Sequence, residues 1–144
     1  PHLDWPEDTR ASVNLGKTLG AADFEIRAEG AQVTANVIGV VENQAPTRAL
    51  RMELPVRDGI VEPEGIAQIA LVERHRATGE VTNAFVSGFG YGPGMAMAST
   101  VAHDSHHMIV VGTDREMMAR AAMRLGEVGG GVTLWQDGTD KALV

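Results

Sequence analysis

One segment of the 144-residue chain has strong helical periodicity, and it lies late in the sequence. Apolar side chains recur along it at helical spacing, at Met117, Met118, Ala121, Ala122, Leu125 and Val128. Thr113-Asp114-Arg115-Glu116 fits a capping box with Thr113 as the N-cap, and Gly129-Gly130-Gly131 is typical of a helix end. The sequence therefore predicts one clear helix over about 113–128.

The rest of the chain has the pattern of short β-strands separated by turns. Alternating or Val/Ile-rich runs lie at 23–28, 32–41, 47–56, 60–61, 65–74, 81–86, 95–102, 108–111 and 132–135. Asp58-Gly59 is a hairpin signal, because this pair readily adopts the positive φ of a tight turn. The tail from Asp137 is expected to fray. We predict an α+β domain with a mostly antiparallel or mixed sheet of about eight short strands.

Length and composition indicate one globular domain. The chain is long enough for one hydrophobic core, and its apolar share of 44% is ordinary. Turn-prone and polar residues dominate the start, so we expect a lead-in or linker over 1–20 and a domain over 21–144. No run approaches the roughly 20 apolar residues of a membrane-spanning helix, and the first residues do not resemble a signal peptide.

Charge and residue usage disfavour several classes of function. The formal net charge of −7 argues against nucleic acid as a partner, since that binding depends on Lys and Arg meeting phosphates. An aromatic share of 4% also disfavours a base-stacking surface. The absence of cysteine excludes disulfides and thiolate metal sites, and it fits a cytoplasmic protein.

Four of the five histidines lie in two clusters, at 72–79 and 99–107. In the second cluster His103 and His106 are three residues apart, so both rings could face one point, and Asp104 could ligate a metal or orient a histidine. This pattern makes a metal site one interpretation, with three candidate ligands: His103, His106 and His107. The alternative is a polar turn between buried strands whose histidines cap backbone groups.

The first cluster contains Glu73-Arg74-His75 at the end of a predicted strand. One interpretation is a strand end that points charged groups at a cleft. The other is that Glu73 and Arg74 pair with neighbours while His75 is solvated. The candidate catalytic residues of the two clusters are Glu73, His75 and Asp104. The glycines over 88–94 do not form a GxGxxG fingerprint, and their alternation suggests closely packed backbone.

Several short runs, taken together and in order, resemble the C-terminal domain of adenine deaminases. The runs are Glu73-Arg74-His75, Thr78-Gly79, Gly88-Phe89-Gly90, residues 98–106 and residues 109–113. The resemblance is specific over about 66–131. His107 is a departure, because the family usually carries asparagine after the His-Asp-Ser-His run.

The resemblance implies an amidohydrolase-type enzyme that hydrolyses adenine to hypoxanthine and ammonia. Its divalent metal, manganese or iron, would be held by histidines and an aspartate on a β/α barrel, and such a barrel alone takes about 250 residues. The chain would then pack on a catalytic barrel domain that it does not contain and help to form a homo-oligomer. If its residues reach the active site, we expect His103, Asp104 and His106 first, followed by Glu73 and His75.

A second hypothesis is a stand-alone module that binds a small ligand or a metal. It would use the cluster from His103 to His107, and His107 is the residue that favours it. The two hypotheses predict different surfaces. A domain of a larger enzyme should have an apolar patch where the rest of that enzyme packs, whereas a free module should not need one.

Overall fold

The computed structural model describes residue 6 and residues 12–103 and 105–144. In chain order its elements are the 3₁₀-helix η2 (Ala21–Phe24), β1 (Gln32–Gly39), β2 (Arg48–Arg57), β3 (Ile60–Val61), β4 (Ala67–Val72), β5 (Val81–Ser87), β6 (Met95–Ser99), β7 (Met108–Gly112), α1 (Arg115–Val128), β8 (Val132–Gln136) and β9 (Thr139–Leu143). Within this part of the chain, nine strands form one sheet in the order β3-β2-β1-β5-β4-β7-β6-β8-β9. The β1–β5 pair is parallel and the other pairs are antiparallel. The predicted α+β class is confirmed.

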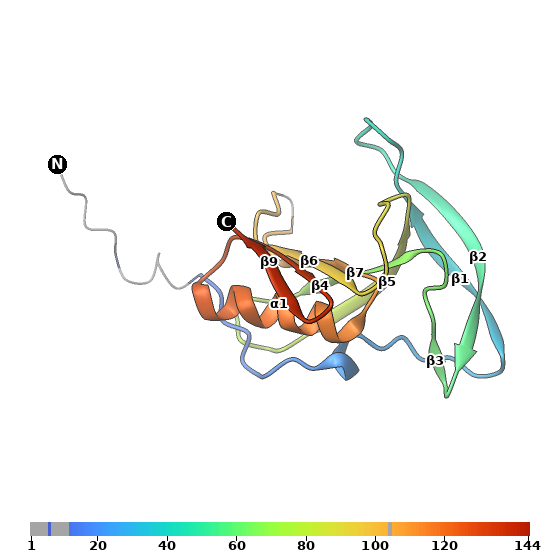
Figure 1. The fold of residues 1–144 in the computed structure, drawn as a ribbon, viewed down its shortest axis with the longest axis horizontal. Coiled ribbons are helices and arrows are strands. Elements are labelled where there is room, and N and C mark those ends of the chain that lie inside the picture. Colours follow the sequence, from blue (N-terminus) through green and yellow to red (C-terminus); the bar gives the residue numbers. More distant parts are fainter. Residues whose placement is uncertain (1–5, 7–11, 104) are drawn as a thin grey trace.

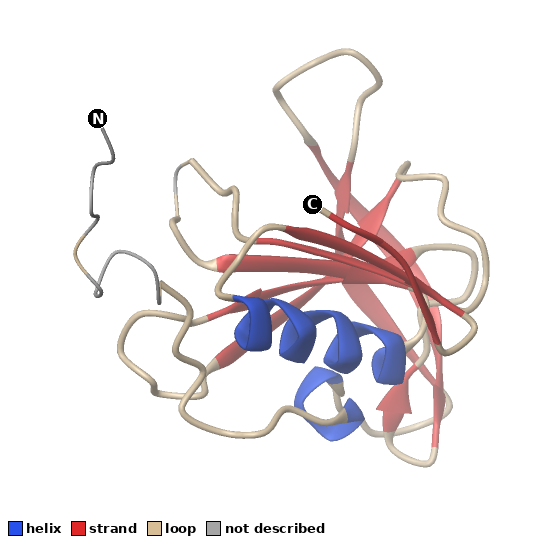
Figure 2. Cartoon of the chain, turned by 60° about the vertical axis from the view of Figure 1, so that its left-hand side comes forward, coloured by secondary structure: helices blue, strands red, loops and turns tan. Residues whose placement is uncertain are grey.

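The main hydrophobic core lies between α1 and one face of the central strands. Figures 1 and 2 show α1 and η2 on the same side of the sheet, beneath β4, β7, β6 and β8. Met118 and Leu125 of the helix are fully buried there, and so are Met108 and Val110 of β7. Ala96 and Ala98 of β6 face them, and their small side chains leave room for the helix.

A second core lies within the arm formed by β1, β2 and β3, which extends away from α1 in Figure 1. Leu54 of β2 is buried there together with Val37 and Phe85 from β1 and β5. Leu50 and Met52 pack against the same cluster, so the alternation predicted along this strand is confirmed. In the described ranges, no helix is both long and apolar enough to cross a membrane.

Helix α1 ends where the sequence predicts but begins two residues later. Gly129 has a left-handed φ of 85° and donates its N–H to the carbonyl of Leu125. At the other end the N-cap is Asp114, whose side chain accepts the N–H of Met117 at 3.0 Å. The prediction of Thr113 as the N-cap is wrong: its hydroxyl accepts the N–H of Met95 at 3.3 Å and donates to the carbonyl of Gly92 at 2.8 Å instead of capping the helix.

Three local expectations differ from the structure. The strand expected over 23–28 is replaced by η2 and a single bridge between Arg27 and Ile60. The tail expected to fray forms β9, because Asp137-Gly138 makes a tight turn with φ values of 48° and 78°. Leu15 and Leu19, in the predicted lead-in, are buried in the main core, although the division at residue 20 itself stays a prediction.

Candidate functional site

The two histidine clusters meet at one end of the central sheet. Strands β4 and β7 are antiparallel, and Val72 at the end of β4 lies opposite Met108 at the start of β7. The residues that follow β4 and those that precede β7 must therefore lie side by side. We call these two segments, 73–78 and 100–107, the paired loops.

Glu73 organises the first of the paired loops through its carboxylate. It accepts the backbone N–H groups of His75 at 2.6 Å, Arg76 at 2.9 Å and Thr78 at 3.2 Å, and also the Thr78 hydroxyl at 3.2 Å. These donors, with Arg76 the strongest, lower the pKa of Glu73 to about 2. The carboxylate is thus ionised at neutral pH and committed to the turn, which leaves it poorly placed to act as an acid or a base.

Arg74 ties the paired loops to each other and to the start of the described chain. Its side chain is almost buried, with a residue exposure of 9%. The guanidinium donates to the carbonyls of His106 at 2.8 Å, Ser12 at 3.2 Å and Thr100 at 3.4 Å. Across residues 12–103 and 105–144, no carboxylate forms an ion pair with it. Arg74 therefore uses its fork of donors to fix backbone rather than to neutralise a charge.

Three histidines of the two clusters lie together at this point. His75 Nε2 is 2.7 Å from the carbonyl of His106, which requires a proton on that nitrogen. The rings of His75 and His107 have centroids 6.2 Å apart and are tilted by 40°. The Nδ1 atom of His107 is buried and has no hydrogen-bond partner among the residues that the structure describes, while His106 has a left-handed φ of 56°. A depression of about 440 Å³ opens beside them, lined by Glu73, His75, Arg76, Thr78, Glu80 and His107.

The structure brings some of the predicted site residues together and separates others. His75 lies beside His106 and His107, whereas His103 is exposed. Asp104 lies outside the described residues. Within the described ranges no three side chains of His, Cys, Asp or Glu are grouped so that they could hold a metal ion. The metal role of His103, His106 and His107 thus stays a prediction.

Arg74 is the residue that sequence reasoning undervalued. Ala70 and Val72 point into the main core, and Arg74 continues the same alternation beyond the end of β4. A charged residue that continues a buried register needs polar partners, which here are main-chain carbonyls. The alternation was visible in the sequence, but the identity of the partners depends on how the loops meet.

The opposite end of the central sheet carries a second cavity, of about 410 Å³. It lies where β5 ends and β4 begins, so the length of the strands separates it from the paired loops. Phe89 and Tyr91, from the glycine-rich passage, stack in its wall with ring centroids 5.2 Å apart. None of the residues that line it is ionisable apart from Tyr91, whose pKa is raised by burial.

Comparison with known proteins places this chain in a family. Residues 44–144 match the family described as the adenine deaminase C-terminal domain. The chain belongs to that family. It is 85% identical over its full length to "Adenine deaminase 1" of Jannaschia sp. (strain CCS1) and 75% identical to "Adenine deaminase" of Ruegeria sp. (strain TM1040). A more distant relative, "Adenine deaminase 1" of Carboxydothermus hydrogenoformans, is 38% identical over 96% of the chain.

The adenine deaminase relatives are much longer than this chain. The chain spans only about a quarter of their length, 24% for the Jannaschia and Ruegeria proteins and 23% for the Carboxydothermus protein. The likeness to the adenine deaminase C-terminal domain also extends beyond the motif-bearing region over 66–131, since these relatives match nearly all of the chain. About three quarters of each relative therefore lies outside the part described here.

Proposed function

We propose that this chain is the terminal domain of an adenine deaminase and supports the hydrolysis of adenine to hypoxanthine and ammonia carried out by the rest of the longer polypeptide. The observation that carries the proposal is the 85% identity, over the whole chain, to a protein named adenine deaminase 1. The chain makes up 24% of that protein, which leaves ample length for a separate catalytic domain.

The described residues support an accessory role rather than a metal-binding one. They do not group three ligating side chains, so the manganese or iron that we expect in the whole enzyme fits the rest of the polypeptide better. Glu73 is occupied by backbone N–H groups, and Arg74 by carbonyls. These two residues give the paired loops a fixed shape. We further propose that the parent enzyme is a cytoplasmic homo-oligomer.

The test uses a chimera in which this chain replaces its matching segment in the Jannaschia protein, to which it is 85% identical. Purified chimera, the Jannaschia protein and the 144-residue chain are each assayed for loss of adenine absorbance with added manganese or iron. We expect turnover by the first two and none by the chain alone. Turnover by the chain alone, or failure of the unmodified Jannaschia protein to convert adenine, would contradict the proposal.

One observation favours the stand-alone metal-binding alternative: the buried Nδ1 of His107, whose ring lies near that of His75, has no hydrogen-bond partner within the described ranges. Elemental analysis of the purified chain, dialysed against manganese, iron or zinc, decides this point. Our proposal predicts less than stoichiometric metal and no change in His103→Ala, His106→Ala or His107→Asn variants. Stoichiometric metal that these substitutions remove would establish a site in this chain.

A further inference from the structure

The central sheet has one covered face and one open face. Alternate residues of β4, β7, β6 and β8 point away from α1, and the strand register places them next to one another. Leu71 lies opposite Ile109, and Val111 lies opposite both Ile69 and Met97. These pairs form two rows across the strands, and β8 extends the row of Ile69, Val111 and Met97 with Leu134, which lies opposite Met97. We call the set Ile69, Leu71, Met97, Ile109, Val111 and Leu134 the open face.

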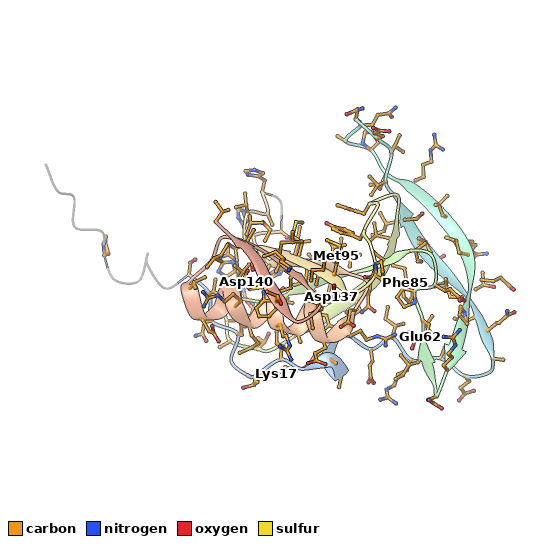
Figure 3. The ribbon with its side chains drawn as sticks, in the orientation of Figure 1. Lys17, Glu62, Phe85, Met95, Asp137 and Asp140 are labelled. Atoms are coloured by element: carbon orange, nitrogen blue, oxygen red, sulfur yellow. The ribbon has the colours of Figure 1, made fainter. Side chains whose placement is uncertain are left out.

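Figure 2 shows that the helices lie on the other side of these strands, and in the described ranges no helix covers the open face. Figure 3 shows Met95, which shares the outward register with Met97, on the side of the sheet away from Lys17 and the helix. Five of the six side chains of the open face are only half-buried, while Val111 is buried. Val40 and Tyr91 pack on the cluster around Val111, and the Tyr91 hydroxyl lies 3.9 Å from Met97 Sδ, so the chain itself covers part of the open face. The rest of this apolar surface is in partial contact with water.

The open face lacks the polar pattern of a solvated sheet. Its neighbours in the same two rows include Thr82, Ala84, Ser99 and Val132, and no charged residue occupies these rows on the four central strands. A sheet that faces water on one side normally alternates apolar with polar residues. Near-continuous apolar runs, such as that of β7, are typical of strands buried on both faces.

Exposed apolar side chains border the open face. Val101 is 62% exposed and belongs to the loop after β6, while Phe89 is 43% exposed and belongs to the loop after β5. Figure 1 shows both loops rising on the side away from α1. Ile38 of β1 is 37% exposed and lies beside Val86 in the outward register. Isolated exposed apolar residues are ordinary, but a large connected apolar patch marks an interaction surface.

We propose that the open face is the surface on which the remainder of the longer adenine deaminase polypeptide packs, with Phe89 and Val101 at its rim. The inference rests on the proposed function and adds the surface through which the domain acts. About three quarters of each long relative lies outside this chain, so a partner covalently joined to the domain is always present. A tethered partner has a high effective concentration and favours an apolar contact of this kind.

The test compares the chain alone, which encloses its own core, with the chimera defined above. Met97→Cys reports on the open face, and Glu116→Cys on the solvent side of α1 is the matched control, because this chain contains no cysteine of its own. Maleimide labelling of each position is followed by peptide mass spectrometry. We expect position 97 to react about tenfold or more slowly in the chimera than in the chain alone, whereas position 116 reacts equally in both.

Each outcome has a distinct meaning. Equal labelling of position 97 in the two proteins overturns the inference, even if the chimera deaminates adenine. Protection in a chimera that has no deaminase activity supports the inference while the proposed function fails. Protection of the chain alone that increases with its concentration assigns the face to a second copy and also overturns the inference. If Met97→Cys does not fold, Leu134→Cys on the neighbouring strand reports on the same face.

Discussion

The two faces of the central sheet are built from the same strands but differ in what completes them. On the helix side Ala70, Ala98 and Val110 are 0–1% exposed, because α1 and the buried side chains of Leu15, Leu19 and Phe24 complete the core there. On the open face Leu71 and Ile109 remain half-buried, although they are larger and equally apolar. The chain therefore supplies a full second layer for one face only, since on the open face Val40 and Tyr91 cover just the cluster around Val111. This difference shows that apolar residues on a sheet face do not form a core by themselves, because a second layer of secondary structure must pack on that face.

The largest effect should come from the covered face. Leu125→Ala removes a fully buried helix side chain and should lower the free energy of unfolding of the chain by about 2–5 kcal/mol. The matched change on the open face, Met97→Ala, should cost less than about 1.5 kcal/mol in the chain alone, since its side chain already contacts water. Urea titrations of both variants provide the measurement. Equal costs would remove the distinction between the faces.

Arg74 should have the next largest effect, because it joins the end of a core strand to the second paired loop. Arg74→Met removes the guanidinium donor to the carbonyls of His106, Ser12 and Thr100, of which His106 still has His75 Nε2 as a partner, and we expect a loss of about 3 kcal/mol. Arg74→Lys should recover only part of this loss, since an ammonium lacks the guanidinium fork. A lower free energy of unfolding in urea titrations, together with shifted NMR signals of His107, would support the role of Arg74 in joining the paired loops. A change below about 0.5 kcal/mol would contradict it.

The N-cap of α1 should have a smaller effect on the same covered face. Asp114→Ala removes the acceptor of the Met117 N–H and should cost about 1 kcal/mol. Asp114→Asn keeps a capping oxygen and is the control. Thermal unfolding followed by circular dichroism measures both. If Asp114→Ala were neutral, the assignment of the cap to this residue would be wrong.

Glu73 should make the stability of the paired loops depend on pH. Its folded pKa of about 2 lies below the usual 4.5, so its contribution is fully present above pH 4.5 and is lost as the pH falls toward 2. Glu73→Gln should therefore be less stable than the unmodified chain at pH 7, and the difference should shrink over this range. Urea midpoints at several pH values between 7 and 2 test this. A difference that stays constant with pH would contradict it.

Much of the covered face could be predicted from the sequence. The stripe along α1 from Met117 to Leu125 and its glycine stop are local signals that the structure confirms, whereas Val128, predicted in the same stripe, is 42% exposed. The Asp58-Gly59 hairpin in the arm is a local signal of the same kind and is also confirmed. The edge strand β9 was missed because its residues are mostly exposed and polar and therefore show no apolar alternation. The Asp137-Gly138 turn is the sequence feature that indicates it. The first twenty residues look polar, yet Leu15 is buried through contacts with distant segments.

The candidate site was less predictable, because it depends on pairing between strands far apart in sequence. The motifs marked Glu73, His75 and the histidines near 106 as notable residues. Their meeting follows from the antiparallel β4–β7 pair, which no local pattern specifies. The partners of Arg74 are backbone carbonyls, and these carry no residue-type signature at all.

Oxidation of the natural methionines tests the difference between the faces most directly, because it needs no substitution. Met97 lies on the open face, Met118 of α1 is fully buried in the main core, and Met123 of the same helix is half-buried. The chain alone and the chimera are treated with dilute peroxide, and sulfoxide is quantified at each methionine by mass spectrometry. We predict that Met97 is oxidised in the chain and protected in the chimera, while Met118 is protected and Met123 is oxidised in both. Oxidation of Met97 at the same rate in the two proteins would contradict this account.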